Sequence, residues 1–137
     1  MKILIVDGQG GGIGRQLVEA LKREGERDLF CVGTNAIATS AMLRAGAARA
    51  ATGENAVAVA CREAEVIAGP VGIVIADALL GEVTPRMAAA VGQSRARKVL
   101  IPVNQCGNFI VGVPAGQTTA QLVAQAVEAI LRPAEEA

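Results

Sequence analysis

Short apolar runs alternate along the whole chain with longer segments in which apolar residues recur at helical spacing. The first run, Ile3 to Val6, is uninterrupted, and it is followed by Ile13, Leu17, Val18 and Leu21 on one face of a predicted helix. Unbroken runs of this length are typical of strands buried on both faces, and amphipathic segments are typical of the helices that cover them. The alternation predicts an α/β fold of three layers around a parallel sheet of about five strands.

The same pattern predicts the remaining elements in order. Strands are expected at residues 29–32, 49–52, 66–68 and 98–103, and helices at residues 36–44, 54–65 and 85–94, with a closing helix that includes residues 122–130. Thr84 before Pro85 indicates a helix N-cap followed by proline at the first helical position, and Thr118 or Thr119 is expected to cap the last helix.

Three further segments complete the prediction. Residues 71–81 fit a buried strand or a buried helix, and we expect the helix. Residues 109–113 are expected to return beside the fifth strand as an antiparallel edge strand at the C-terminal end. Residues 1–132 then form a single domain, and residues 133–137 are expected to be a disordered tail.

A glycine-rich loop joins the first strand to the first helix. Five of its eight residues are glycine; in order they are Asp7, Gly8, Gln9, Gly10, Gly11, Gly12, Ile13 and Gly14. Glycine accepts positive φ and lets a ligand approach the backbone, and a helix N-terminus presents unpaired N–H groups at the positive end of its dipole. The loop therefore predicts a binding site for phosphate or another anion.

The spacing of the glycines limits which kind of phosphate-binding loop this can be. Gly14 is followed by Arg15 and Gln16, so the lysine and hydroxyl of a phosphate-transferring P-loop are absent. The strict Gly-x-Gly-x-x-Gly pattern is absent as well. Gly8, Gly12 and Gly14 instead satisfy Gly-x-x-x-Gly-x-Gly.

This spacing resembles the glycine loop of short-chain dehydrogenase/reductases over the first quarter of the chain. The resemblance implies a Rossmann-like domain in which Gly8 makes the turn, Gly12 lies under a pyrophosphate and Gly14 lets the helix pack on the strand. Asp7 stands where those enzymes commonly have Thr, and the chain contains no Tyr for their Tyr-x-x-x-Lys motif. A classical member of that enzyme family is therefore excluded.

The end of the second strand is expected to contribute to the same site. A domain that binds NAD usually has Asp or Glu there to hold the ribose, whereas this chain has Thr34 and Asn35. Neutral groups can bind a ribose or a 2′-phosphate, so NADP, NAD and other nucleotides all stay open. Alternatively, Thr34 or Asn35 only caps the next helix. Pro70 and Gly72, after the fourth strand, are expected to face the same crevice.

Composition excludes several other functions. Lys plus Arg and Asp plus Glu number 13 each, and Phe30 and Phe109 are the only aromatic residues. Neither a cationic surface nor stacking platforms for nucleic acid are indicated. The chain has no His, so triad hydrolases and typical zinc sites are excluded. With 52% apolar and 19% charged residues, it is expected to form a homo-oligomer, such as a dimer, through residues 71–83 or 109–113.

The cysteines and the hydropathy pattern suggest the compartment. Cys31, Cys61 and Cys106 are odd in number and widely spaced, which favours free thiols and a cytoplasmic location. Polar residues and prolines interrupt the uncharged segment 99–127, so no membrane contact is expected.

These features favour binding of a nucleotide or another anionic small molecule at the glycine loop. Two alternatives remain open: an enzyme that uses Asp7 and Glu54 on a small metabolite, with or without magnesium, and a structural homo-oligomer with no ligand. The chain is also similar, from Met1 to about Val113, to a small bacterial family known only as a domain of unknown function. The similarity rests on the glycine loop and on the segments that begin at Gly33, Ala51, Gly69 and Gly81.

Overall fold

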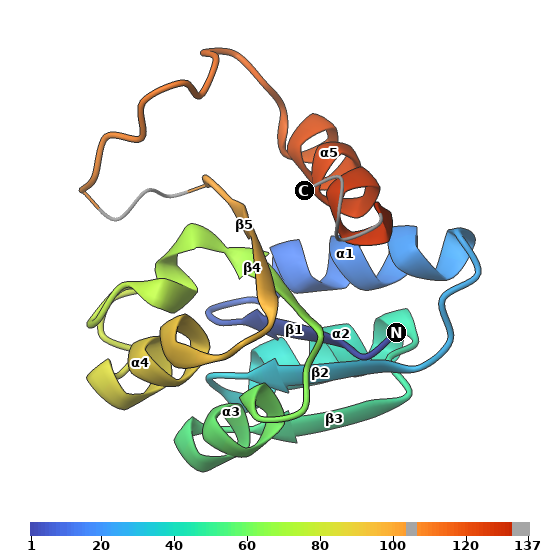
Figure 1. Cartoon of the computed structure of the whole chain (residues 1–137), viewed down its shortest axis with the longest axis vertical. Helices are drawn as coiled ribbons and strands as arrows, with labels where there is room; N and C mark the ends of the chain where they lie inside the picture. Colours follow the sequence, from blue (N-terminus) through green and yellow to red (C-terminus); the bar gives the residue numbers. More distant parts are fainter. Residues whose placement is uncertain (104–106, 133–137) are drawn as a thin grey trace.

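Five parallel strands form one sheet in the order β3-β2-β1-β4-β5 in the computed structural model, which describes residues 1–103 and 107–132 (Figure 1). The strands are Ile3–Asp7 (β1), Leu29–Gly33 (β2), Arg49–Thr52 (β3), Val66–Pro70 (β4) and Arg97–Ile101 (β5). The helices are Gly12–Arg23 (α1), Ala36–Ala45 (α2), Glu54–Cys61 (α3), Pro85–Gln93 (α4) and Thr119–Leu131 (α5), with a 3₁₀ turn at Val71–Val74 (η1). The predicted three-layer α/β fold with a five-stranded parallel sheet is confirmed.

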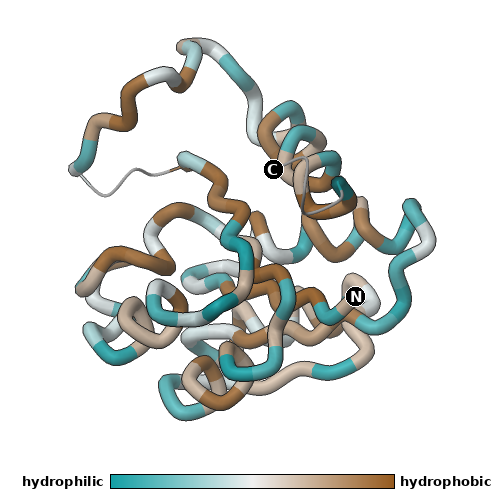
Figure 2. The backbone as a smooth tube through the Cα atoms, viewed as in Figure 1, coloured by the Kyte–Doolittle hydropathy of each residue, from teal (hydrophilic) through white to brown (hydrophobic). Residues whose placement is uncertain are grey.

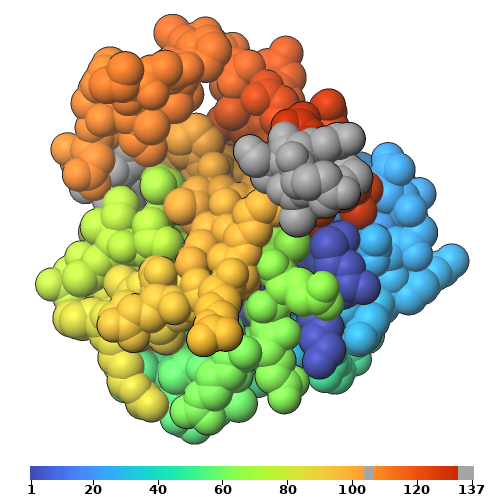
Figure 3. All heavy atoms as spheres, in the orientation of Figure 1, coloured from blue at the N-terminus to red at the C-terminus, as the bar shows by residue number. Residues whose placement is uncertain are grey.

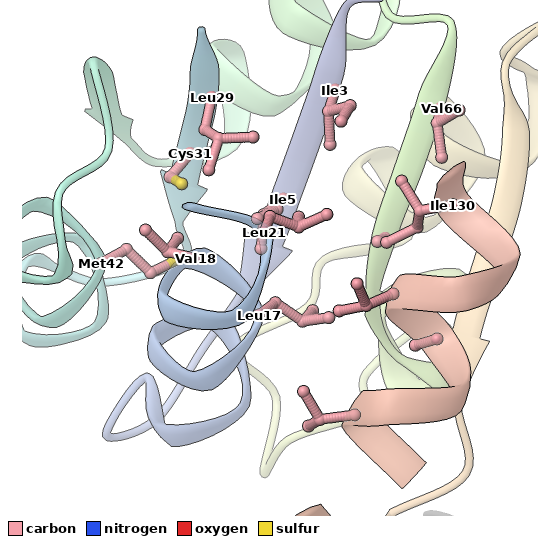
Figure 4. Close-up of a cluster of buried hydrophobic side chains, with 14 of the residues drawn as sticks. Ile3, Ile5, Leu17, Val18, Leu21, Leu29, Cys31, Met42, Val66 and Ile130 are labelled. Carbon is pink, nitrogen blue, oxygen red and sulfur yellow. The ribbon is translucent and has the colours of Figure 1, made fainter. Parts of the chain in front are cut away.

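The helices cover both faces of the sheet. Side chains of α1, α2 and α5 pack on one face, and those of α3, α4 and η1 pack on the other. Figure 4 shows the first cluster, in which Leu17 and Leu21 of α1 meet Ile5 of β1 and Ile130 of α5. Figure 2 shows mostly apolar residues along the central strands and a mixture of apolar and polar residues along the helices. Because β1 and β4 are buried on both faces, their apolar runs carry no polar alternation.

The order of the strands places a topological switch point between β1 and β4. The chain runs outward from β1 to β2 and β3, then crosses back to β4 and β5 on the other side. In open parallel sheets, ligands bind beyond the carboxyl ends of the strands at such a point. The glycine loop follows β1 at this position.

The expected helix at residues 71–81 is wrong beyond its first turn. After η1, residues 75–83 form a compact strap in which Asp77, Leu79, Leu80 and Gly81 all have φ between 55° and 91°. These values are incompatible with a right-handed helix and cost about 1–2 kcal/mol for each residue other than glycine. The cost is offset by burial, because the side chains of Ala78, Leu79 and Val83 lie in the core.

The expected antiparallel edge strand at residues 109–113 is also wrong. The described residues 107–118 form an arm without regular structure that extends beyond the end of β5 before α5 begins (Figures 1 and 3). Gly107 and Gly112 have φ of 78° and 90°, which turns the chain away from the sheet, and the side chains of Phe109 and Val111 are 88% and 86% exposed. Self-association through this arm or the strap stays a prediction.

Caps begin the last two helices as the sequence predicts. Thr84 accepts a hydrogen bond from the Met87 N–H, and Thr118 forms a reciprocal capping box with Gln121. Other boundaries shift by up to four residues from those predicted; α3, for example, ends at Cys61. The expected tail at residues 133–137 lies outside the described part of the chain.

The two described cysteines, Cys31 and Cys61, are buried free thiols, as expected. Burial raises their pKa to about 12 and about 11, so neither is a reactive thiolate at neutral pH. Cys106 and its neighbours Asn104 and Gln105 lie outside the described residues. Over residues 1–103 and 107–132, no helix is long and apolar enough to cross a membrane, and no group of potential ligands could hold a metal ion.

Candidate functional site

A pocket of about 250 Å³ opens beyond the carboxyl ends of β1 and β4. Residues from the glycine loop, the strap and the two helix N-termini meet there; of the described residues, the lining consists of Asp7, Gly8, Gln9, Gly10, Gly11, Gly12, Ile13, Gln16, Pro70, Leu79, Val103 and Thr119. Larger hollows lie between α3 and α4, beside Phe30 and beside α5, away from the carboxyl ends of the strands. Those hollows lack the glycine loop, so the smaller pocket is the candidate site.

Packing explains two glycines of the loop, Gly8 and Gly11. A side chain on Gly8 would place its Cβ 2.5 Å from Thr34 Oγ1 and 2.8 Å from Leu79 Cδ1. Gly11 has φ of 75° and approaches the backbone of α2, where a Cβ would lie 2.8 Å from the Cα of Ala38. These contacts lie inside normal van der Waals distance, so the fold alone explains both residues.

Gly14 is likewise explained by packing. A Cβ on this residue would overlap Met42 and would lie 3.0 Å from the Cβ of Asp7. The absence of a side chain therefore lets α1 approach both β1 and α2. This is the packing role that the sequence resemblance implies for Gly14.

Gly10 and Gly12 differ from the other three. A Cβ on either residue would meet no atom within 4 Å, and neither residue has positive φ. Their N–H groups form no hydrogen bond with any described residue, and both line the pocket. Neither backbone conformation nor packing therefore requires glycine at these two positions.

Four other backbone N–H groups of the loop donate hydrogen bonds to the protein's own oxygens. Asp7 accepts hydrogen bonds from Gly8 N–H (2.8 Å) and Gly14 N–H (2.7 Å) through its two carboxylate oxygens. Glu82 Oε1 accepts one from Gln9 N–H (2.8 Å), and the Gly8 carbonyl accepts one from Gly11 N–H (2.9 Å). Fewer N–H groups of the loop are therefore free to bind an anion than the sequence suggests.

Asp7 is a buried carboxylate at the end of β1 and only 4% exposed. Burial raises the pKa of its carboxyl group, Glu82 raises it further, and hydrogen bonds from the loop partly oppose the shift. This geometry is that of a carboxylate that accepts hydrogen bonds from the N–H groups of the loop. Both of its oxygens already have partners, so Asp7 shapes the loop.

The enzyme alternative that combines Asp7 with Glu54 finds no common site. Glu54 begins α3, where it forms an ion pair with Arg86 at 3.4 Å, and it is absent from the described lining of the pocket. A hydrogen bond from Thr84 lowers the pKa of Glu54, and Arg86 lowers it further. Glu54 is therefore a paired surface carboxylate at a different position.

Thr34 and Asn35 lie at the end of β2 but outside the pocket. The Asn35 side chain caps α2 by accepting a hydrogen bond from Ala38 N–H (2.8 Å), which matches the capping alternative. Both side chains also donate hydrogen bonds to Glu82. Of the two residues expected after β4, Pro70 lines the pocket, whereas Gly72 is buried and does not.

Two helix N-termini face the pocket. The first turn of α1 begins at Gly12, and Thr119 lies in the first turn of α5. No Lys or Arg is among the described lining residues, so the positive potential at this site comes from backbone N–H groups and helix dipoles. Sequence reasoning missed Gln16, Leu79, Val103 and Thr119, because no local motif marks them.

The sheet order and the glycine loop at the switch point define a Rossmann-like α/β protein. A solved structure of a nucleoside-diphosphate-sugar epimerase from Pseudomonas aeruginosa has a similar fold, with a TM-score of 0.50 and 16% sequence identity. The likeness covers 95% of this chain and 47% of the epimerase, so the chain spans about half the length of that protein. The chain belongs to the family described as Domain of unknown function (DUF3842), whose model matches residues 2–135. No curated protein matches it.

Proposed function

We propose that the protein binds a nucleotide or dinucleotide, with phosphate oxygens accepting hydrogen bonds from the N–H groups of Gly10 and Gly12. The observation that carries the proposal is the contrast within the loop. Three glycines are explained by the fold, whereas these two combine open space, free donors and a place in the pocket. Glycine in ordered structure costs about 0.5–1 kcal/mol relative to Ala, and close approach by a ligand supplies a reason to accept that cost.

The electrostatics of the pocket favour an anion without a cationic side chain. The 12-residue helix α1 directs its positive end at Gly12, and α5 directs its own at Thr119. Backbone N–H groups at a helix N-terminus bind phosphate in many nucleotide-binding folds. The Asp7 charge opposes this potential, but the hydrogen bonds from Gly8 and Gly14 neutralise part of its effect.

The size of the pocket suits the phosphate portion of a nucleotide. Sites that enclose a drug-sized molecule usually have volumes of about 300–1,000 Å³, so a pocket of about 250 Å³ encloses less than a dinucleotide. The remainder of the ligand would lie over the open rim. The epimerase of similar fold acts, by its name, on nucleoside-diphosphate sugars. The diphosphate of such a ligand carries the anionic oxygens that the proposed site would bind.

A titration panel tests the proposal. We expect isothermal titration calorimetry against NAD, NADP, ATP, ADP-ribose and coenzyme A to find at least one ligand with a micromolar dissociation constant. Inorganic sulfate at matched ionic strength serves as the control for nonspecific anion binding. If no member of the panel binds, the protein is not a nucleotide-binding protein of this type.

A further inference from the structure

Glu82 brings a carboxylate to the end of β2 from a different part of the chain. It lies in the strap, and its Oε1 accepts three hydrogen bonds: from Gln9 N–H (2.8 Å), Thr34 Oγ1 (2.7 Å) and Asn35 Nδ2 (2.7 Å). These donors come from the glycine loop and from the end of β2, the two segments that hold the ribose and phosphates in Rossmann-like domains. The strap and the loop meet at the same end of the sheet (Figure 1).

The three hydrogen bonds hold Glu82 as an anion. Burial raises the pKa of its carboxyl group, but the hydrogen bonds from Gln9, Thr34 and Asn35 outweigh burial and leave the pKa lowered. Within the described ranges, no Lys or Arg forms an ion pair with Glu82. Its negative charge is thus compensated by neutral donors alone, so it remains available to repel another anion.

Neighbouring residues also hold the Glu82 side chain in place. Gly8 lies close to it, because a Cβ on Gly8 would come 3.0 Å from Glu82 Oε1 and 2.8 Å from Cδ1 of Leu79 in the same strap. The donors Thr34 and Asn35, which could have bound a 2′-phosphate, are occupied by this carboxylate. Glu82 Oε2 has no hydrogen-bond partner among the described residues and is free to accept one from a ribose hydroxyl.

We infer that Glu82 makes the site selective for nucleotides with free ribose hydroxyls and excludes those with a 2′-phosphate. The inference rests on the proposed nucleotide binding and specifies its ligand class. The usual device is a carboxylate on the residue that follows β2. Here the strap supplies the carboxylate from residue 82, and neutral residues at positions 34 and 35 orient it.

Competition between NAD and NADP tests the inference, because the two ligands differ only by the 2′-phosphate. We expect the wild-type protein to bind NAD at least ten times more tightly than NADP, and Glu82→Gln to bring the ratio to threefold or less. Gln keeps the size and an acceptor oxygen but removes the charge. Glu82→Asp retains the charge and should retain the preference for NAD.

Two controls separate selectivity from general damage. Glu63 is an exposed carboxylate near the amino ends of the strands and is not among the described residues that line the candidate pocket, so Glu63→Gln should leave the ratio unchanged. Thermal unfolding shows whether each variant is folded. The ratio of the NAD and NADP affinities within one variant does not change when both affinities fall by the same factor.

Each other outcome is decisive. Equal binding of NAD and NADP by the wild type, or an unchanged ratio in Glu82→Gln, overturns the role of Glu82 while nucleotide binding stands. Binding of other nucleotides but of neither NAD nor NADP also overturns it, because the presence or absence of a 2′-phosphate then does not decide which ligand binds. Absence of binding by every nucleotide overturns the proposed function itself.

Discussion

Replacing Gly12 with Asp is expected to weaken nucleotide binding by about a hundredfold, equivalent to about 2.7 kcal/mol. A Cβ at this position meets no protein atom, so the new carboxylate has room to lie in the pocket. It would occupy the N–H groups at the start of α1 and would repel phosphate. Calorimetric titration with the tightest ligand of the panel measures the loss.

The same substitution should leave the fold intact. An acidic side chain in the first turn stabilises a helix by about 0.3–1 kcal/mol, so the melting temperature of Gly12→Asp should equal or exceed that of the wild type. Gly92→Ala is the matched control, because Gly92 is also a helical glycine with open space around it but lies in α4, away from the pocket. If Gly12→Asp binds as tightly as Gly92→Ala, phosphate does not occupy the start of α1.

Replacing Gly69 with Ala is expected to lower the free energy of unfolding by about 3 kcal/mol. Gly69 lies in β4, and a Cβ there would overlap the backbone carbonyl oxygen of Val6 in β1. A strand backbone cannot move aside as a flexible side chain can, so β1 and β4 would have to separate at the switch point. Urea denaturation measures the change.

Gly92→Ala again provides the comparison. It should raise the free energy of unfolding by about 0.5–1 kcal/mol, because it replaces an exposed helical glycine without a clash. A Gly69→Ala variant as stable as the wild type would show that β1 and β4 do not approach as closely as described. The glycine loop and Pro70 would then be positioned differently around the pocket.

Most of the architecture could be predicted from local pattern. The buried strand Ile3–Asp7 and the amphipathic helix Gly12–Arg23 each carry a strong periodic signal, and Thr84 and Thr118 mark helix starts. The strap could not be predicted, because Leu79 and Leu80 adopt positive φ against their own preference. Burial of Ala78, Leu79 and Val83 determines this conformation, and burial depends on the rest of the fold.

The site could be predicted in its position but only partly in its chemistry. Asp7 and the glycines stand out in the sequence because they are consecutive. Their separate roles depend on neighbours such as Met42 and Ala38, which only the folded chain brings close. The hydrogen-bond partners of Glu82 could not be predicted from the sequence, since they lie 47, 48 and 73 residues away.

Backbone amide chemical shifts of Gly10 and Gly12 would show whether these two groups bind phosphate. In ¹⁵N-labelled protein titrated with pyrophosphate, and then with the tightest nucleotide, we expect both amide protons to move downfield in a saturable manner as they donate hydrogen bonds. The Gly92 amide should not move. Unchanged signals from Gly10 and Gly12 when the nucleotide is saturating would contradict the proposed site.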